Sequence, residues 1–398
     1  MNLPSKGFLV ILILILFINN TGCWNRVEPE DLTLVLMMGI EREEEKGDMK
    51  LTVQAANPMQ GGAEEEGDSG NQEKPYWVVS ATGPTLRAAV KNLNKKSTRE
   101  INLTHMEILL LSEELAREGI EPVLDFLQRG RESRFIIQPM VVEGDLGKAM
   151  KGEYETEDLG AMAISRQHQV VLDELAATID YPLRIMFNRL SQPGCEILLP
   201  RLKVMELEGG ELSPVSPLEV DGAAAFYRDR MVGWLNDKET RGYNWVINDI
   251  NRPVYVFESP AHPEREVTVE IFQSSSNLEA RVQGEEVHIR VSVIAEGRIQ
   301  ETTSPEEKLS GETETADSLN RRLAQAVRND IQAALDKGQE ALKSDIFGFG
   351  NLIYRTLPRK WEKMEDDWFD HYPEVQVEIL VEADVRRTGL VKDPLEIK

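Results

Sequence analysis

An unbroken run of eleven apolar residues, Phe8–Ile18, follows Lys6 at the amino terminus. A helix of that length is about 16 Å long, which is too short to cross a bilayer core of about 30 Å. The run instead has the length of a signal-peptide core, and Gly22-Cys23 follows it closely. A small residue directly before a cysteine at this place is typical of bacterial lipoproteins. Residues 1–22 are therefore predicted to be a lipoprotein signal peptide.

Cys23 is the predicted lipidation site. We expect its thiol to carry diacylglycerol, and its amino group can take a further acyl chain such as palmitate. Two chains give stable anchoring. Asn20 stands where the cleavage motif usually has Leu, and the alternative is an uncleaved membrane anchor that happens to contain a cysteine. The net charge of −24 repels anionic lipid, so acyl chains rather than surface charge are expected to hold the chain at a membrane.

Composition and the absence of known motifs exclude several classes of function. The 69 Asp and Glu against 45 Lys and Arg argue against nucleic-acid binding. Two cysteines in 398 residues exclude a disulfide scaffold, and Cys195 is expected to be a half-buried strand residue rather than a nucleophile. The sequence contains no phosphate loop, nucleophile elbow or zinc-protease motif. No catalytic residue, cofactor or metal ligand is therefore predicted, and we expect that the chain is not an enzyme.

Residues 23–208 are predicted to form an N-terminal α/β region, because apolar runs and alternating segments follow one another at the spacing of strands and helices. Residues 57–75 are rich in Gly, Glu, Ser and Asn and are expected to be a flexible acidic loop. Ser112 is a plausible helix cap. Strands are predicted at 32–40, 50–55, 76–81, 106–111, 135–142 and 196–205, and helices at 84–93, 112–114 onward, 121–128, 145–150 and 181–190.

Residues 209–217, rich in Gly, Ser and Pro, are the predicted linker to a C-terminal α+β region at 218–398. Apolar residues at four-residue steps predict a long helix near 315–342, with a buried stripe of Leu319, Leu323, Val327, Ile331 and Leu335. The expected fold is multi-domain and mixed α/β or α+β, with antiparallel and mixed sheets packed by helices. Strands in this region are predicted at 220–227, 231–235, 254–257, 267–272, 278–282, 287–294 and 374–385.

Ser344–Gly350, followed by Pro358 and Trp361, forms a distinctive block after the long helix. Asp345 could cap the next helical turn. Gly348 and Gly350 permit positive φ or close backbone approach, and Trp361 is a large apolar anchor. Two interpretations are open. The block is either a structural corner between helices or a docking surface for a partner.

Short motifs along nearly the whole chain follow an order and spacing that resemble the Ger(x)C family, the lipoprotein C subunits of bacterial spore germinant receptors. The sequence departs from the family pattern at Asn25, at Val27-Glu28 and at Thr104. The matching segments are Gly22–Glu28, Leu34–Ile40, Thr104–Glu107, Ser112–Ala116, Leu124–Leu127, Gly222–Phe226, Met231–Leu235, Glu239–Gly242, Ser344–Gly350, Pro358, Trp361 and Thr388–Leu390.

The resemblance implies a non-enzymatic, lipid-anchored receptor subunit with three mixed α/β domains, on the outer face of the spore inner membrane. It implies that the subunit is required, with membrane-embedded A and B subunits, for the response to nutrient germinants. The alternative is a substrate-binding lipoprotein of a membrane transporter, which requires two similar α/β lobes around a ligand cleft. A surface hydrolase is a third option.

Overall fold

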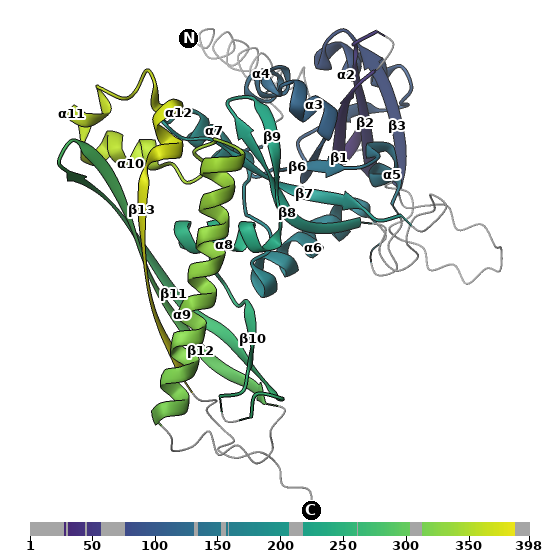
Figure 1. Cartoon of the computed structure of the whole chain (residues 1–398). Coiled ribbons are helices and arrows are strands. Elements are labelled where there is room, and N and C mark those ends of the chain that lie inside the picture. The colour runs from purple at the N-terminus through teal and green to yellow at the C-terminus, as the bar shows by residue number, and fades with distance from the viewer. Residues whose placement is uncertain are drawn as a thin grey trace, which may run out of the picture.

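The computed structural model describes residues 28, 31–43, 46–56, 76–130, 134–152, 157, 159–206, 218–260, 262–302 and 313–386. The predicted signal peptide, Cys23, the acidic loop at 57–75, the linker at 209–217 and the motif at Thr388–Leu390 lie outside these residues. Two sheets with helices around them make up the described part (Figure 1). Within that part, no helix is long and apolar enough to cross a membrane.

The first sheet has nine strands, four of which form a parallel centre. β1, β5, β6 and β7 run parallel, and antiparallel pairs extend the sheet on both sides. The strands in spatial order are β3 (Tyr76–Gly83), β2 (Met49–Ala56), β1 (Leu32–Arg42), β5 (Ile108–Ser112), β6 (Gln138–Glu143), β7 (Leu198–Val204), β8 (Leu218–Tyr227) and β9 (Arg230–Leu235), with β4 (Glu100–Asn102) beside β1.

Helices cover both faces of the parallel centre, which is why every residue of β5 is buried and all but Ser112 are apolar. Alternate residues of β5 face opposite ways, so Leu109 and Leu111 join one core cluster while Ile108 and Leu110 join the other. The first cluster includes α2 (Leu86–Asn94), α3 (Glu113–Glu118), α4 (Glu121–Arg129) and α7 (Leu183–Leu190). The second includes α5 (Leu146–Lys151) and α6 (Gly160–Leu175).

Helix starts follow side-chain caps where the sequence supplies them. Ser112 accepts the Leu115 N–H, which confirms the predicted cap. The prediction that a helix begins at Pro84 is wrong by two residues, because Thr85 caps it and α2 begins at Leu86. α6 was not predicted from the sequence, and its N-cap residue, Leu159, makes no side-chain cap hydrogen bond.

The second sheet is built from long strands in the order β10 (Val254–Glu258), β11 (Glu266–Gln283), β12 (Glu286–Thr302) and β13 (Gln376–Arg386). The prediction of separate strands at 267–272 and 278–282 is wrong, because β11 runs continuously through the polar stretch between them. Ser274 and Ser276 in that stretch donate to backbone carbonyls of Ile250 and Val246. β13 closes the sheet parallel to β12.

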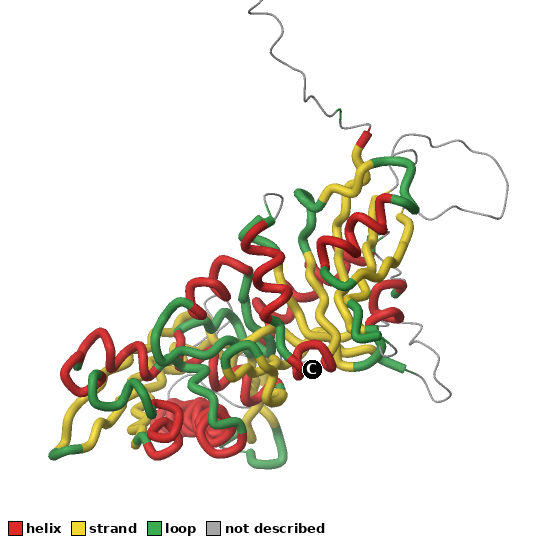
Figure 2. The backbone as a smooth tube through the Cα atoms, turned by 90° about the horizontal axis from the view of Figure 1, so that it is seen from above, coloured by secondary structure: helices red, strands yellow, loops and turns green. Residues whose placement is uncertain are grey.

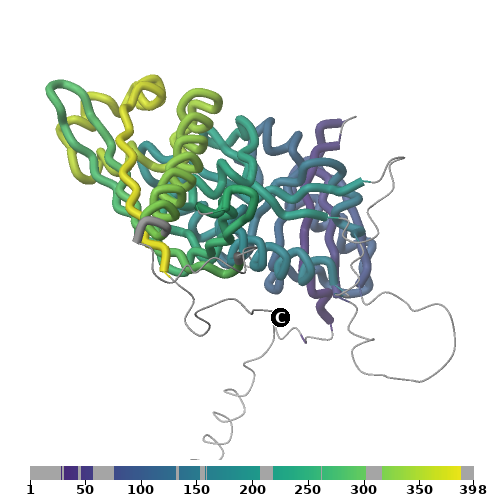
Figure 3. The backbone as a smooth tube through the Cα atoms, turned by 60° about the horizontal axis from the view of Figure 1, so that its bottom comes forward, coloured from purple at the N-terminus to yellow at the C-terminus, as the bar shows by residue number. Residues whose placement is uncertain are grey.

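One long helix, α9 (Thr313–Asp336), packs against this sheet and continues into a short π-helical turn, Lys337–Ala341 (Figures 1 and 3). The predicted stripe from Leu319 to Leu335 is fully buried, which confirms the helix. α8 (Asp237–Ile247), which was not predicted, begins with a capping box between Asn236 and Glu239 and packs against α9.

The strands on either side of the predicted linker lie in the same sheet. Val204 of β7 is paired with Leu218 of β8, so β8 and β9 extend the first sheet beyond residue 217. The linker itself lies outside the described residues, so the domain boundary at 209–217 stays a prediction. The mixed α+β, multi-element architecture with two helix-covered sheets agrees with the predicted fold class.

Candidate functional site

The block singled out in the sequence forms a helical corner between α9 and β13. After the π-helical turn, the chain passes through α10 (Phe349–Thr356), α11 (Pro358–Trp361), α12 (Trp368–His371) and the 3-10 turn Tyr372–Glu374. These short helices lie together at one end of the second sheet, beside α7, which packs against the first sheet (Figure 1). Figure 2 shows the chain from above, with helices in red and strands in yellow.

Asp345 is the centre of this corner and is fully buried. Its Oδ1 accepts the backbone N–H groups of Gly348 and Phe349 at 2.8 and 3.0 Å. Its Oδ2 accepts the Gly350 N–H at 2.7 Å and the indole N–H of Trp368 at 3.1 Å. Burial raises the pKa of Asp345 to about 6, although the backbone donors oppose the shift. The Asp345 carboxylate thus bonds to the first residues of both α10 and α12.

Neighbouring atoms lie so close to the backbone at Gly348 and Gly350 that both positions require glycine. Gly348 has φ +78°, and a Cβ there would lie 2.7 Å from the Cys195 sulfur. A Cβ on Gly350 would lie 2.6 Å from Trp368 Nε1 and 2.7 Å from the Cα of Gly194. No larger residue fits either position without movement of its neighbours.

The corner docks onto the loop that precedes β7. The Glu196 N–H donates to the Asp345 carbonyl at 3.0 Å, and the Asn351 N–H donates to the Gly194 carbonyl at 3.2 Å. The Arg189 guanidinium bridges the two segments, since it donates to the carbonyls of Glu196 and Ile346. The corner is therefore bonded to the part of the chain that leads into the first sheet.

Trp361 fills the space beneath this contact. It is 4% exposed, and its ring centroid lies 5.6 Å from that of Trp368 and 6.3 Å from that of Tyr354. Pro358 lies at the exposed start of α11. The structure thus brings Asp345, both glycines and Trp361 together in a buried junction, and leaves Pro358 at its surface. A partner would meet the outer residues of this junction rather than its centre.

Two members of the junction were missed from the sequence. Arg189 lies near the end of α7, and Glu196 follows the turn at Pro193-Gly194, where no local pattern indicates a buried glutamate. Glu196 is 2% exposed, and its Oε2 accepts the Arg228 N–H at 2.6 Å. Burial raises the pKa of Glu196 to about 7, with the charge of Asp345 adding to the shift.

Cys195 belongs to the same loop and not to a strand, because β7 begins at Leu198. The expectation of a half-buried strand residue is therefore corrected to a buried loop residue. Burial raises the pKa of the Cys195 thiol to about 11. A thiol with so high a pKa is almost entirely protonated at neutral pH, which makes it a poor nucleophile.

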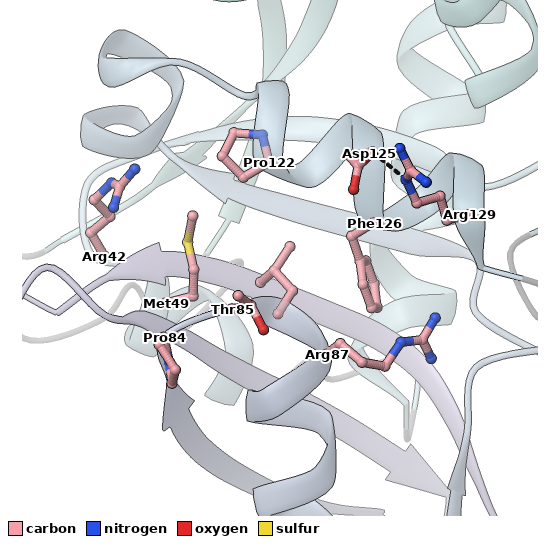
Figure 4. Close-up of a pocket in the computed structure, with 10 residues that line it drawn as sticks. Arg42, Met49, Pro84, Thr85, Arg87, Pro122, Asp125, Phe126 and Arg129 are labelled. Atoms are coloured by element: carbon pink, nitrogen blue, oxygen red, sulfur yellow. Dashed lines mark hydrogen bonds and ion pairs between the residues drawn. The ribbon is translucent and has the colours of Figure 1, made fainter.

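A groove of about 490 Å³ lies between α2 and α4, at the end of β1 (Figure 4). Its apolar lining comes from Met49, Leu86 and Phe126 with Pro84 and Pro122, and its polar lining comes from Thr85, Asp125 and three arginines, Arg42, Arg87 and Arg129.

The arginines of this groove already have partners. Arg42 pairs with Glu118, and Arg129 with Asp125. The Arg87 guanidinium lies 5.2 Å from the centroid of the Phe126 ring. The lining contains no nucleophile–base pair. Among the residues described, no group of three His, Cys, Asp or Glu is placed to hold a metal ion.

Comparison with known proteins finds two adjoining family models on this chain. Residues 25–204 match the spore germination protein N-terminal domain, and residues 221–389 match the spore germination B3/GerAC-like C-terminal domain. The gap between the two models contains the predicted linker.

Relatives match over almost their full length. Spore germination protein KC of Bacillus subtilis is 26% identical, with 98% of each chain covered. Spore germination protein B3 of the same organism is 23% identical, with 93% of this chain and 95% of the relative covered. The crystal structure of the GerBC protein superposes with a TM-score of 0.54 at 19% identity, covering 87% of this chain and 97% of that one. Together, the two family models and the shared fold show that the chain belongs to the Ger(x)C family of spore germination proteins.

Proposed function

We propose that this chain is the lipid-anchored subunit of a spore nutrient germinant receptor. The observation that carries the proposal is that both family models match, in order, a chain whose Gly22-Cys23 follows a signal-peptide core. Membrane-embedded A and B subunits are the expected partners. The expected location is the outer face of the spore inner membrane, where the complex starts germination in response to nutrients.

A binding or scaffolding role agrees better with the described residues than catalysis does. The conspicuous carboxylate, Asp345, accepts hydrogen bonds from four donors and is not among the residues that line the groove of Figure 4. The buried thiol of Cys195 has a raised pKa. These groups stabilise the junction, so the chain is proposed to act through its surfaces.

The transporter-lipoprotein alternative gains no support from the architecture. It requires two similar lobes with a ligand between them. The two sheets here differ, since the first is centred on short parallel strands and the second consists largely of a long hairpin. The groove of Figure 4 lies within the first region, between α2 and α4.

Germination of spores that carry Cys23→Ala in place of the native chain tests the proposal. Loss of the acyl chains removes the confinement to the membrane plane, which lowers the effective concentration at the partners. We expect the variant to leave the membrane fraction and the nutrient response to be strongly delayed, while germination by a non-nutrient trigger continues. Normal nutrient germination with a soluble Cys23→Ala chain would contradict the proposal.

A further inference from the structure

Two adjacent apolar side chains stand exposed just before β6. Phe135 is 55% exposed and Ile136 is 59% exposed. Phe135 is held in place, because its ring stands edge-on to Phe187 of α7 at 5.9 Å and its carbonyl accepts the Arg184 N–H at 2.9 Å. Two adjacent apolar side chains that remain exposed, one of them fixed by its neighbours, indicate a surface that meets something apolar.

The register of the first sheet places this pair at the edge where the chain enters. β1, β5 and β6 run parallel, with Met37 opposite Ile108 and Ile108 opposite Gln138. The residues before β6 and the residues before β1 therefore emerge on the same side of the sheet, which we call the strand-start edge. β1 and β6 are separated only by β5, so their axes are about 10 Å apart.

The segment between the lipidation site and the sheet is short. Cys23 precedes Leu32 by nine residues, which reach at most about 30 Å when fully extended. A compact chain of this length is roughly 50 Å across. If Cys23 carries acyl chains, as the proposed function holds, the strand-start edge must lie nearer the bilayer than the rest of the molecule. This step rests on the proposed function.

Two arginines flank the exposed pair, and the exposed Glu107 lies on the neighbouring strand start. Arg134 directly precedes the pair, and Arg184 is hydrogen-bonded to it through the backbone. Both arginines are exposed, and neither forms an ion pair with another described residue. Apolar side chains flanked by arginine suit the boundary between lipid headgroups and acyl chains, where the guanidinium groups meet phosphates.

We propose that the strand-start edge contacts the lipid bilayer directly, with Phe135 and Ile136 inserted among the headgroups and Arg134 and Arg184 on the phosphates. The acyl chains and this contact would together fix the orientation of the first sheet on the membrane. The bilayer is the occupant argued for, because the tether brings this edge against lipid and basic residues match an anionic surface.

The chain offers a matched control at Val170, which is 59% exposed, as Ile136 is, but lies on α6. Ile136→Cys and Val170→Cys would each be labelled with a nitrobenzoxadiazole fluorophore in the full lipidated chain. Buried Cys195 contributes little background labelling. Each protein is then reconstituted into vesicles of phosphatidylethanolamine and phosphatidylglycerol that contain nitroxide-labelled lipid. We expect a blue shift and several-fold stronger quenching at position 136 than at position 170.

The outcomes separate this inference from the function it rests on. If the chain floats with the vesicles but position 136 is no more quenched than position 170, the bilayer contact is wrong while the lipid anchor stands. If a chain with intact Cys23 does not float, the anchor fails and the contact fails with it. If position 136 is shielded only when the membrane subunits are added, the surface meets protein, which also overturns the lipid contact.

Discussion

The indole N–H of Trp368 donates to Asp345 Oδ2 at 3.1 Å, across 23 residues of chain, inside a fully buried junction. This bond joins α12, at the end of the helical corner, to Asp345 at its beginning. It therefore fixes the position of the chain shortly before β13 begins. The same carboxylate also holds the first turn of α10. The stability of the second sheet therefore depends on a group that lies outside it.

Asp345→Asn is expected to destabilise the protein by about 2–4 kcal/mol. The amide offers only one acceptor oxygen, so the –NH₂ group faces either backbone donors or the Trp368 indole and leaves buried donors unpaired. Chemical denaturation followed by tryptophan fluorescence measures the change. Asp366→Asn, at an exposed position of the same corner, is the control and should change stability by less than about 0.5 kcal/mol. Equal effects of both substitutions would show that the junction bonds contribute little.

Gly194→Ala should be more costly than Gly284→Ala, although both glycines have nearly the same positive φ, +61° and +65°. A Cβ on Gly194 would lie 2.6 Å from Gly350 Cα and from Trp361, whereas nothing lies within 4 Å at Gly284. Both variants bear the backbone strain of about 1–2 kcal/mol. Overpacking adds about 1–3 kcal/mol at Gly194 alone. Thermal or chemical unfolding of the pair measures the difference, and equal losses would contradict the crowding.

The free energy of unfolding should fall as pH rises from about 4.5 to about 7, because Glu196 titrates at a higher pH in the folded chain than in the unfolded chain. Its folded-state pKa, about 7, lies above the ordinary value of 4.5, so in this window the folded chain holds a proton that the unfolded chain has lost. The stabilisation that the raised pKa of Glu196 gives the folded state is complete below pH 4.5 and is lost by pH 7. It amounts to roughly 3 kcal/mol. Asp345, with a pKa raised to about 6, adds a change of the same sign.

Glu196→Gln should flatten this part of the pH profile, since the amide can still accept the Arg228 N–H but cannot ionise. Urea denaturation at half-unit pH steps provides the comparison with the unsubstituted chain. Glu362→Gln, at an exposed position, is the control and should leave the slope unchanged. A profile for Glu196→Gln that follows the unsubstituted chain would show that Glu196 is not the titrating group.

The Cys195 thiol should react with a maleimide roughly a hundredfold more slowly than a free cysteine at pH 7. Its pKa of about 11 lowers the thiolate fraction, and burial restricts access further. Full reactivity should return in denaturant. The lipidated chain is suitable for the test because acylated Cys23 does not react. Rapid labelling of the folded protein would mean that the loop before β7 opens readily.

Much of this architecture could be predicted because local signals and tertiary environment agree. The four-residue stripe of α9 and the alternation in β12 and β13 each report one buried face. α6 could not be predicted in the same way, because its first residue, Gly160, packs on Gln54 and its cap makes no side-chain bond. β11 is one strand where the sequence predicts two, because Ser274 and Ser276 between the apolar segments donate to carbonyls of a distant segment, which no local pattern indicates.

Only part of the junction could be predicted from the sequence, for a related reason. Asp345, the glycines and Trp361 lie close together along the chain, so their pattern could be recognised. Arg189 and Glu196 lie about 150 residues earlier, and only the folded chain brings them alongside. Burial of Glu196 has no local sequence signal, since a glutamate after a Pro-Gly turn is ordinarily exposed.

Chemical crosslinking of this chain in spore membranes, followed by purification and mass spectrometry, tests the receptor-subunit proposal most directly. The N-terminal peptide mass is read in the same experiment. We predict a diacylglyceryl Cys23 peptide, together with a polytopic membrane subunit and its A-type companion. Recovery of an ATP-driven permease in their place would contradict the proposal and favour the solute-binding alternative.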